Sequence, residues 1–299
     1  MYIPKSYYSS EVIHKNRCKM YWWMLITTFI IGILGYAIST FFHFGLTGTG
    51  CFLIGAGIID YVAYYYSDKF IIKSENAKPI TEKQIPQLYE MVKRICENNN
   101  LKMPRLYLID SQTINAFATG RNADLAIIAV TKGMLEKLTP EEISGVIGHE
   151  LAHIETQDMK IMSILSILSG LVCILGDMFW TSAMIGNASE KDESGIVNIV
   201  GLVLALFAPL TSLLIKLSVS RTQEFAADAR GAELSGNPQY LTHALEKIKR
   251  DRIKVPHVSK ATAHLYFASP FKDDVIGELF STHPDIDERI RRLLNMNIQ

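Results

Sequence analysis

Four long apolar runs interrupt the mixed pattern of polar and hydrophobic residues along this chain. They cover Tyr21–Phe44, Leu46–Tyr66, Met159–Ile185 and Ile196–Ser218. Each run is long enough for a helix that crosses a bilayer, and aromatic residues gather at the ends of the first two, as at a membrane–water interface. The pattern therefore predicts two transmembrane hairpins.

The apolar runs have two alternative interpretations, of which only the second stays open. The first run is too long for a cleaved signal peptide, and a second apolar run follows it at once. For the pair within 159–218, a buried hairpin of a soluble core stays open as an alternative, and Pro209 is compatible with either. Asp60 lies inside the second run, where we expect it to face another helix or to reach toward the interface.

The stretches between and after the hairpins predict a mainly α-helical domain with a small β-sheet. Amphipathic spacing predicts a helix over Thr81–Asn98 and, near the end of the chain, one over Ile286–Leu294. Short β-rich runs predict strands at Arg105–Ile109 and Leu125–Val130. The predicted organisation is an N-terminal segment (1–20), a hairpin (21–66), a first part of the soluble domain (67–158), a second hairpin (159–218) and a second part of that domain (219–299).

Charge and composition narrow the class of protein. The 299 residues are 48% hydrophobic, and 30 basic residues balance 30 acidic ones, so nothing indicates a nucleic-acid partner. Four scattered cysteines (Cys18, Cys51, Cys96 and Cys173) form no metal or disulfide pattern. Lysines flank the first hairpin, whereas the link at 186–195 is acidic. The positive-inside rule therefore places both termini and the soluble domain in the cytoplasm.

One motif carries recognisable chemistry, the sequence His149-Glu150-Leu151-Ala152-His153. Histidines four residues apart share one face of a helix, where both imidazoles can reach one metal ion. Glu150 is then placed to take a proton from water. The preceding Thr139-Pro140-Glu141-Glu142 has the pattern of a capped helix start. The alternative, a surface helix with two unrelated histidines, fits this setting poorly.

A catalytic metal site normally needs a third protein ligand. Glu224 and Asp228 lie four residues apart in a predicted helix that follows the last apolar run. One of these carboxylates could bind the metal while the other holds a ligand histidine. Taken alone, the pair could equally be a solvated helix face. We favour Glu224 as the third ligand. Four spans return its helix to the membrane side that carries His153, and both residues lie a short distance from the spans that adjoin them.

With these residues in place, the chain resembles the HtpX-type membrane zinc metalloproteases, a gluzincin family related to the CAAX prenyl proteases. The resemblance runs from the first hairpin through Asn115-Ala116-Phe117-Ala118-Thr119-Gly120 and the histidine motif to Glu224, Asp228 and His283-Pro284. It implies an integral membrane endopeptidase with one Zn²⁺ per chain and four transmembrane helices. It also implies a bacterial cell-membrane location with a cytoplasmic site, and a role in membrane-protein quality control under stress.

The resemblance also implies individual roles. His149, His153 and Glu224 would bind zinc, Glu150 would act as the general base, and Asp228 would orient a histidine. The segment that begins with Asn115, Ala116 and Phe117 would be an edge strand that pairs with the substrate; without the resemblance we would interpret it as a surface loop. His283 would lie beside the substrate carbonyl, with Arg289 as a possible partner, although a histidine before proline is more often a turn residue.

The expected partners are protein or peptide substrates, among them misfolded membrane proteins, and the lipid bilayer. Two other functions stay open. One is a narrow processing peptidase, and the other is a membrane scaffold that keeps a metal site without turnover.

Overall fold

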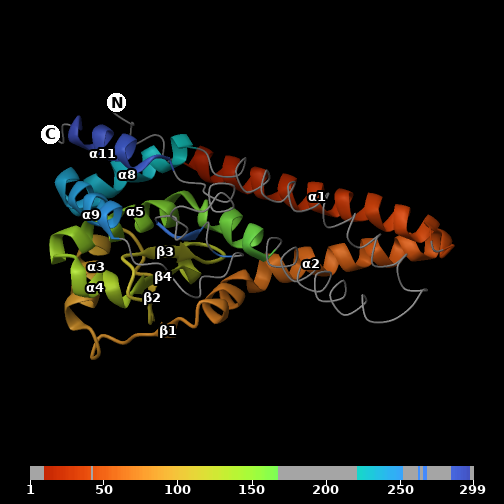
Figure 1. The fold of residues 1–299 in the computed structure, drawn as a ribbon, viewed down its shortest axis with the longest axis horizontal. Helices are drawn as coiled ribbons and strands as arrows, with labels where there is room; N and C mark the ends of the chain where they lie inside the picture. The colour runs from red at the N-terminus through yellow and green to blue at the C-terminus, as the bar shows by residue number, and fades with distance from the viewer. Residues whose placement is uncertain are drawn as a thin grey trace, which may run out of the picture.

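The computed structural model describes residues 10–41, 43–167, 221–251, 262, 265–267 and 284–296. Its elements are α1 (Ser10–Phe41), α2 (Gly45–Ser74), β1 (Lys78–Pro79), α3 (Pro86–Asn98), β2 (Arg105–Ile109), β3 (Ala116–Thr119), the 3₁₀ turn η2 (Ala123–Leu125), β4 (Ile127–Thr131), α4 (Lys132–Lys137), α5 (Pro140–Thr156), α8 (Arg221–Ser235), α9 (Pro238–Arg250) and α11 (Ile286–Leu294). Figure 1 shows α1 and α2 projecting together from a globular part that surrounds a small sheet.

The projecting pair has the surface expected of a membrane hairpin. Almost all the large apolar side chains that are exposed in the described residues lie on α1, on α2 or, as Phe44, in the turn between them, the exceptions being Leu125 and Leu294. By length and composition, α2 is the one described helix that qualifies as a membrane span. Asp60 on α2 is buried and accepts a 2.6 Å hydrogen bond from the Thr28 hydroxyl on α1, so it faces the neighbouring helix as predicted.

Both helices of the hairpin extend beyond their apolar runs. The polar turns at the start of α1 pack on the globular part, where Asn16 donates to the Thr156 carbonyl (3.0 Å) and accepts from Gln223 (3.0 Å). At the other end of the hairpin, α2 continues past Tyr66 to Ser74. The expected boundary between 66 and 67 thus falls inside a continuous helix. Beyond residue 167, the third and fourth predicted spans lie outside the described residues.

The sheet is small, as the fold class predicted, and its strand pairing is mixed. Its strand order is β1-β2-β4-β3. Strand β2 pairs with β4 in parallel, whereas β1–β2 and β3–β4 are antiparallel. Strand β3 therefore lies at an edge of the sheet. This edge faces α5, whose histidine motif lies nearby (Figure 1).

Two predicted boundaries were wrong for local reasons. The helix expected from Thr81 begins at Pro86, because the residue before a proline avoids helical geometry and Ile85 has φ −138° and ψ 72°. The preceding turn is held instead by Gln84, which accepts from the backbone N–H and the hydroxyl of Thr81. Strand β4 begins at Ile127 rather than Leu125, because Asn122 caps the short turn η2.

The motif helix α5 is the centre of the globular part. It begins with the predicted capping box between Thr139 and Glu142. Along its length it packs against α8 and α9, and its crossing with α8 is very close. A Cβ atom on Gly231 would lie 2.6 Å from the backbone nitrogen of His149, and one on Gly148 would lie 2.4 Å from the Gly231 carbonyl oxygen. Only glycines permit this contact, which brings the carboxylates of α8 to the histidines of α5.

Candidate metal centre

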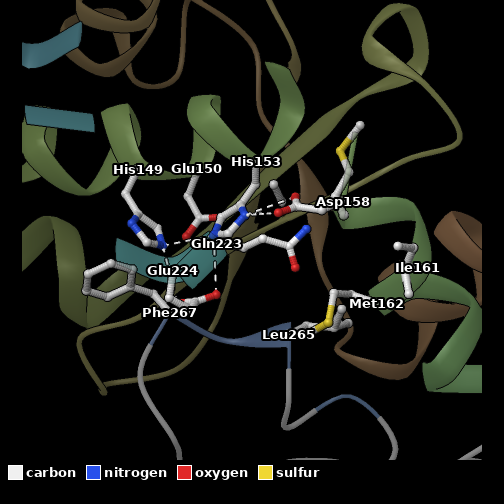
Figure 2. Close-up of a pocket in the computed structure, with 12 residues that line it drawn as sticks. His149, Glu150, His153, Asp158, Ile161, Met162, Gln223, Glu224, Leu265 and Phe267 are labelled. Carbon is white, nitrogen blue, oxygen red and sulfur yellow. Dashed lines mark hydrogen bonds and ion pairs between the residues drawn. The ribbon is translucent and has the colours of Figure 1, made fainter. Parts of the chain in front are cut away.

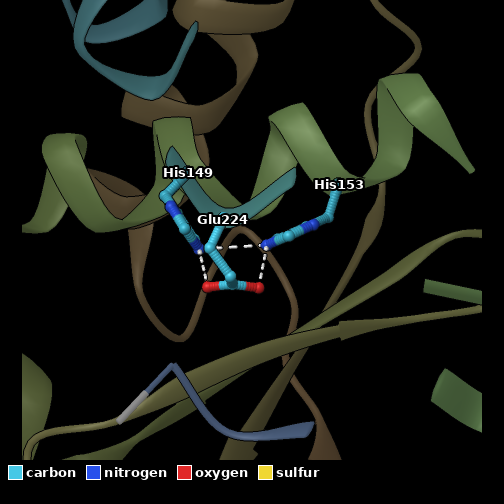
Figure 3. Close-up of side chains that lie close together, drawn as sticks. All are labelled: His149, His153 and Glu224. Atoms are coloured by element: carbon cyan, nitrogen blue, oxygen red, sulfur yellow. Dashed lines mark hydrogen bonds and ion pairs between the residues drawn. The ribbon is translucent and has the colours of Figure 1, made fainter. Parts of the chain in front are cut away.

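Three side chains from α5 and α8 converge on one point. The Nε2 atoms of His149 and His153 are 3.0 Å apart. Glu224 reaches them from α8, with carboxylate oxygens 3.9 Å from His149 Nε2 and 3.7 Å from His153 Nε2. One ligand atom from each residue lies within 4.8 Å of the other two. Figure 3 shows the three side chains pointing at one another.

Each histidine is oriented by a carboxylate on its other ring nitrogen. His149 Nδ1 is 3.0 Å from Asp228, on α8, and His153 Nδ1 is 3.0 Å from both oxygens of Asp158. Such bonds fix the ring and leave the Nε2 lone pair for a metal. Asp228 lies where it was expected. Asp158 was missed, because a single aspartate just after a helix has no distinctive spacing.

Burial and charge suit a cation at this point. Burial lowers the pKa of His149 to about 4, so this imidazole is neutral. Burial would also lower the pKa of His153, but Asp158, Glu224 and Glu150 raise it to about 10. The site thus attracts positive charge to the space that the imidazoles and Glu224 enclose. Two imidazole nitrogens and a carboxylate are a donor set that divalent zinc accepts, so these residues fit a catalytic metal.

Glu150 lies beside the same pocket. Burial, together with the neighbouring charge of Glu224, raises its pKa to about 7, and the Ala118 N–H of β3 donates a hydrogen bond to it. The edge of β3 thus faces Glu150. Figure 2 shows Glu150 between the two histidines, with the apolar side chains of Met162, Leu265 and Phe267 on the other side of the pocket.

The remaining candidate residues divide into three groups. Asn115 directly precedes β3, which begins at Ala116, and the Phe267 N–H donates to the Ala116 carbonyl (2.8 Å). The Phe117 ring turns away from the pocket into a buried cluster against Tyr266, and Ala118 lines the pocket instead. His283 lies outside the described residues. Arg289 is fully buried and binds Asp228 through two hydrogen bonds, a role that the sequence did not suggest.

Comparison with known proteins identifies the relatives of this chain. The model of peptidase family M48 matches residues 82–297. The chain belongs to peptidase family M48. This M48 peptidase is 40% identical to a protease HtpX homolog of Desulforapulum autotrophicum over 83% of its own length and 81% of the relative. It is 38% identical to a protease HtpX homolog of Methanocaldococcus jannaschii over 94% of its own length and 97% of the relative. It is 40% identical to protease HtpX of Legionella pneumophila (strain Corby) over 84% of its own length and 90% of the relative.

A solved structure of S. mikatae Ste24p has the same fold as this M48 peptidase. It superposes with a TM-score of 0.50 at 19% identity, covering 92% of this chain and 67% of that one. The family assignment makes the protein a membrane metalloprotease. It therefore excludes the alternative of a membrane scaffold that keeps a metal site without turnover. The resemblance inferred from the motifs is confirmed.

Proposed function

We propose that this protein is a zinc endopeptidase that hydrolyses peptide bonds of membrane or membrane-adjacent proteins, including misfolded ones, in quality control under stress. The observation that carries the proposal is the convergence of His149, His153 and Glu224 beside Glu150 and the edge of β3. We further propose four spans in a bacterial cell membrane, with the site and both termini in the cytoplasm.

Each residue of the pocket has a separate role in the reaction. His149, His153 and Glu224 would hold the zinc ion. A bound zinc ion supplies Lewis-acid chemistry, which lowers the pKa of water and stabilises negative charge on oxygen. Glu150 takes the proton of the attacking water and passes it to the departing amine nitrogen. Asp228 and Asp158 keep the two imidazoles in the tautomer that presents Nε2 to the metal.

Strand β3 supports recognition of an extended peptide. It is an edge strand whose Ala118 N–H already points at Glu150. A peptide that pairs with this edge would run past the general base with its backbone held by hydrogen bonds, a form of β-augmentation. Sequence-independent backbone pairing suits an enzyme with many substrates.

The pocket lining supports substrates that are rich in apolar residues. Ile161, Met162, Leu265 and Phe267 form apolar walls beside the polar centre. Ile161 and Met162 belong to the helical residues 159–167, which pack against α1 and α2. The pocket therefore adjoins the hairpin that we assign to the membrane, and segments leaving the bilayer would reach it directly.

A purified full-length chain in detergent, incubated with an unfolded protein substrate, tests this function. We expect cleavage that a chelator abolishes and added zinc restores. Glu150→Gln should lower turnover about 10²–10⁴-fold, because the amide cannot accept the proton, while zinc content stays unchanged. Glu155→Gln is the matched control, since Glu155 lies on the same helix and pairs with Arg230 away from the pocket. Near-normal cleavage by Glu150→Gln would refute the mechanism, and cleavage confined to one position would favour a processing peptidase.

A further inference from the structure

A buried lysine lies where the globular part meets the hairpin. Lys160 follows Asp158 closely, and only 7% of its surface is exposed. Its Nζ atom lies 3.7 Å from the centre of the Tyr64 ring on α2. The structure shows no carboxylate within ion-pair distance of Lys160 among the described residues. A charge that is removed from water in this way is costly unless an anion accompanies it.

Two arginines add to the positive charge at this place. Arg17 lies on α1, one turn before Tyr21, and Arg121 lies just after β3. Their positive charges oppose that of Lys160. The Arg121 guanidinium lies 5.1 Å from the centre of the Tyr65 ring. Within the part of the chain that the structure describes, neither arginine forms an ion pair. Three cations from three separate segments thus lie around these tyrosines, and none of them pairs with an acid among the described residues.

Tyrosines complete this group. Tyr21 and Tyr64 stack with ring centres 6.5 Å apart. Tyr64 packs edge-on against Tyr65 at 4.9 Å. Tyr21 and Tyr65 are exposed, and they lie beside the exposed apolar side chains of α1 and α2. Tyrosines between an apolar surface and a polar domain are typical of the headgroup level of a bilayer.

We propose that Arg17, Arg121 and Lys160, with Tyr21, Tyr64 and Tyr65, bind the phosphate of an anionic phospholipid headgroup. This inference rests on the membrane placement of the hairpin given under the proposed function. A lipid phosphate fits better than a soluble one, because acyl chains attached to it can lie on the exposed apolar surface that begins beside the tyrosines. Basic pockets between membrane helices on the cytoplasmic side are suited to such headgroups.

Lipid binding to the full-length protein in detergent provides the test. Native mass spectrometry with added phosphatidylglycerol or phosphatidylcholine yields an apparent Kd for each lipid. We expect clear preference for phosphatidylglycerol. Because each cation near anionic lipid contributes about fivefold in affinity, a variant with Arg17→Gln, Arg121→Gln and Lys160→Gln should bind it roughly 10²-fold more weakly. Lys69→Gln is the matched control: like Lys160, Lys69 lies over a tyrosine ring of α2 (Tyr66, 5.0 Å), but it is outside this group.

Each outcome bears on the proposal. Equal lipid affinity of the triple variant and the wild type would overturn it, and so would an equal loss in Lys69→Gln. Competition by inorganic phosphate as effective as that by the lipid would show a site for free phosphate and would also overturn it. If the triple variant fails to fold, Arg121→Gln alone, in a loop, should lose about fivefold. None of these measurements uses proteolysis, so their failure is distinct from failure of the peptidase assignment.

Discussion

Arg289 and Asp228 form a two-point ion pair inside the protein, directly behind His149. Nε and Nη2 of Arg289 lie 2.9 and 2.7 Å from the two oxygens of Asp228, and Nη1 donates to the Phe267 carbonyl (3.2 Å). Burial alone would raise the pKa of Asp228, but Arg289 and His149 lower it to about 2. Asp228 therefore stays ionised and can accept the Nδ1–H of His149. Helix α11 thus supports the metal centre from outside the pocket.

The first prediction concerns this pair. Arg289→Met should destabilise the protein by about 3–5 kcal/mol, because it leaves a buried carboxylate without its partner. We also expect weaker metal binding, since His149 loses the fixed acceptor. Thermal unfolding in detergent and metal content measure the two effects. Arg291→Met on the same helix is the control: its side chain is 71% exposed and pairs with Glu288, so a change below about 1 kcal/mol is expected. Equal effects of the two substitutions would contradict the role of Arg289.

The second prediction concerns Asp158, which the structure places against His153. Asp158→Ala should lower metal affinity by about 10–100-fold, because the imidazole loses the acceptor that orients it. Asp158→Asn keeps one acceptor oxygen and should lose less. Competition with a chromophoric chelator measures the affinity. Asp124→Ala, at an exposed pair with Lys102, should leave it unchanged. Wild-type affinity in Asp158→Ala would exclude an orienting role.

The third prediction concerns the close crossing of α5 and α8. Gly231→Ala places a methyl group against the backbone of His149, and such overpacking costs about 1–3 kcal/mol. We expect a lower melting temperature and weaker metal binding together, because the two helices must separate to admit it. Gly50→Ala provides a control, since beyond its own turn of α2 no described atom lies within 4 Å of the added carbon. An unchanged metal affinity in Gly231→Ala would show that the crossing does not set the ligand geometry.

The fourth prediction concerns membrane orientation. In a chain whose native cysteines are replaced, Ser189→Cys in the acidic link should react with an impermeant thiol reagent added to intact cells. Asn98→Cys should react only after permeabilisation, because the globular part then lies inside. The reverse labelling pattern would place the catalytic domain outside the cell and would overturn the proposed location.

Local sequence signals predicted the elements that carry the site. The capping box of α5, its apolar face and its histidine spacing are all contained in one stretch, and β2 and α11 have their predicted bounds. Glu224 could be chosen because α8 follows an apolar run and carries its two carboxylates on one face. For these elements, the residues that make the sequence pattern are the same neighbouring residues that form the local structure.

Other features depend on contacts between segments that are distant in the sequence, so no local sequence pattern predicted them. Arg289 reaches Asp228 across 61 positions, and its helix reads from sequence as an ordinary charged surface helix. The grouping of Arg17, Arg121 and Lys160 needs three segments to meet. Asp158 was missed although it lies close to His153, because its effect depends on the turn at Gln157, whose φ is 56°.

The hydrogen bonds of Asn16 and the ion pair of Arg289 have a consequence for biosynthesis. Asn16, on the first described helix, joins α5 to α8, and Arg289, on the last, neutralises the carboxylate behind His149. Translation produces the first long before the second. A ribosome-bound chain that has already inserted its hairpin and made both histidines still lacks the arginine that fixes their geometry. We therefore expect the nascent chain to stay inactive until α11 has docked.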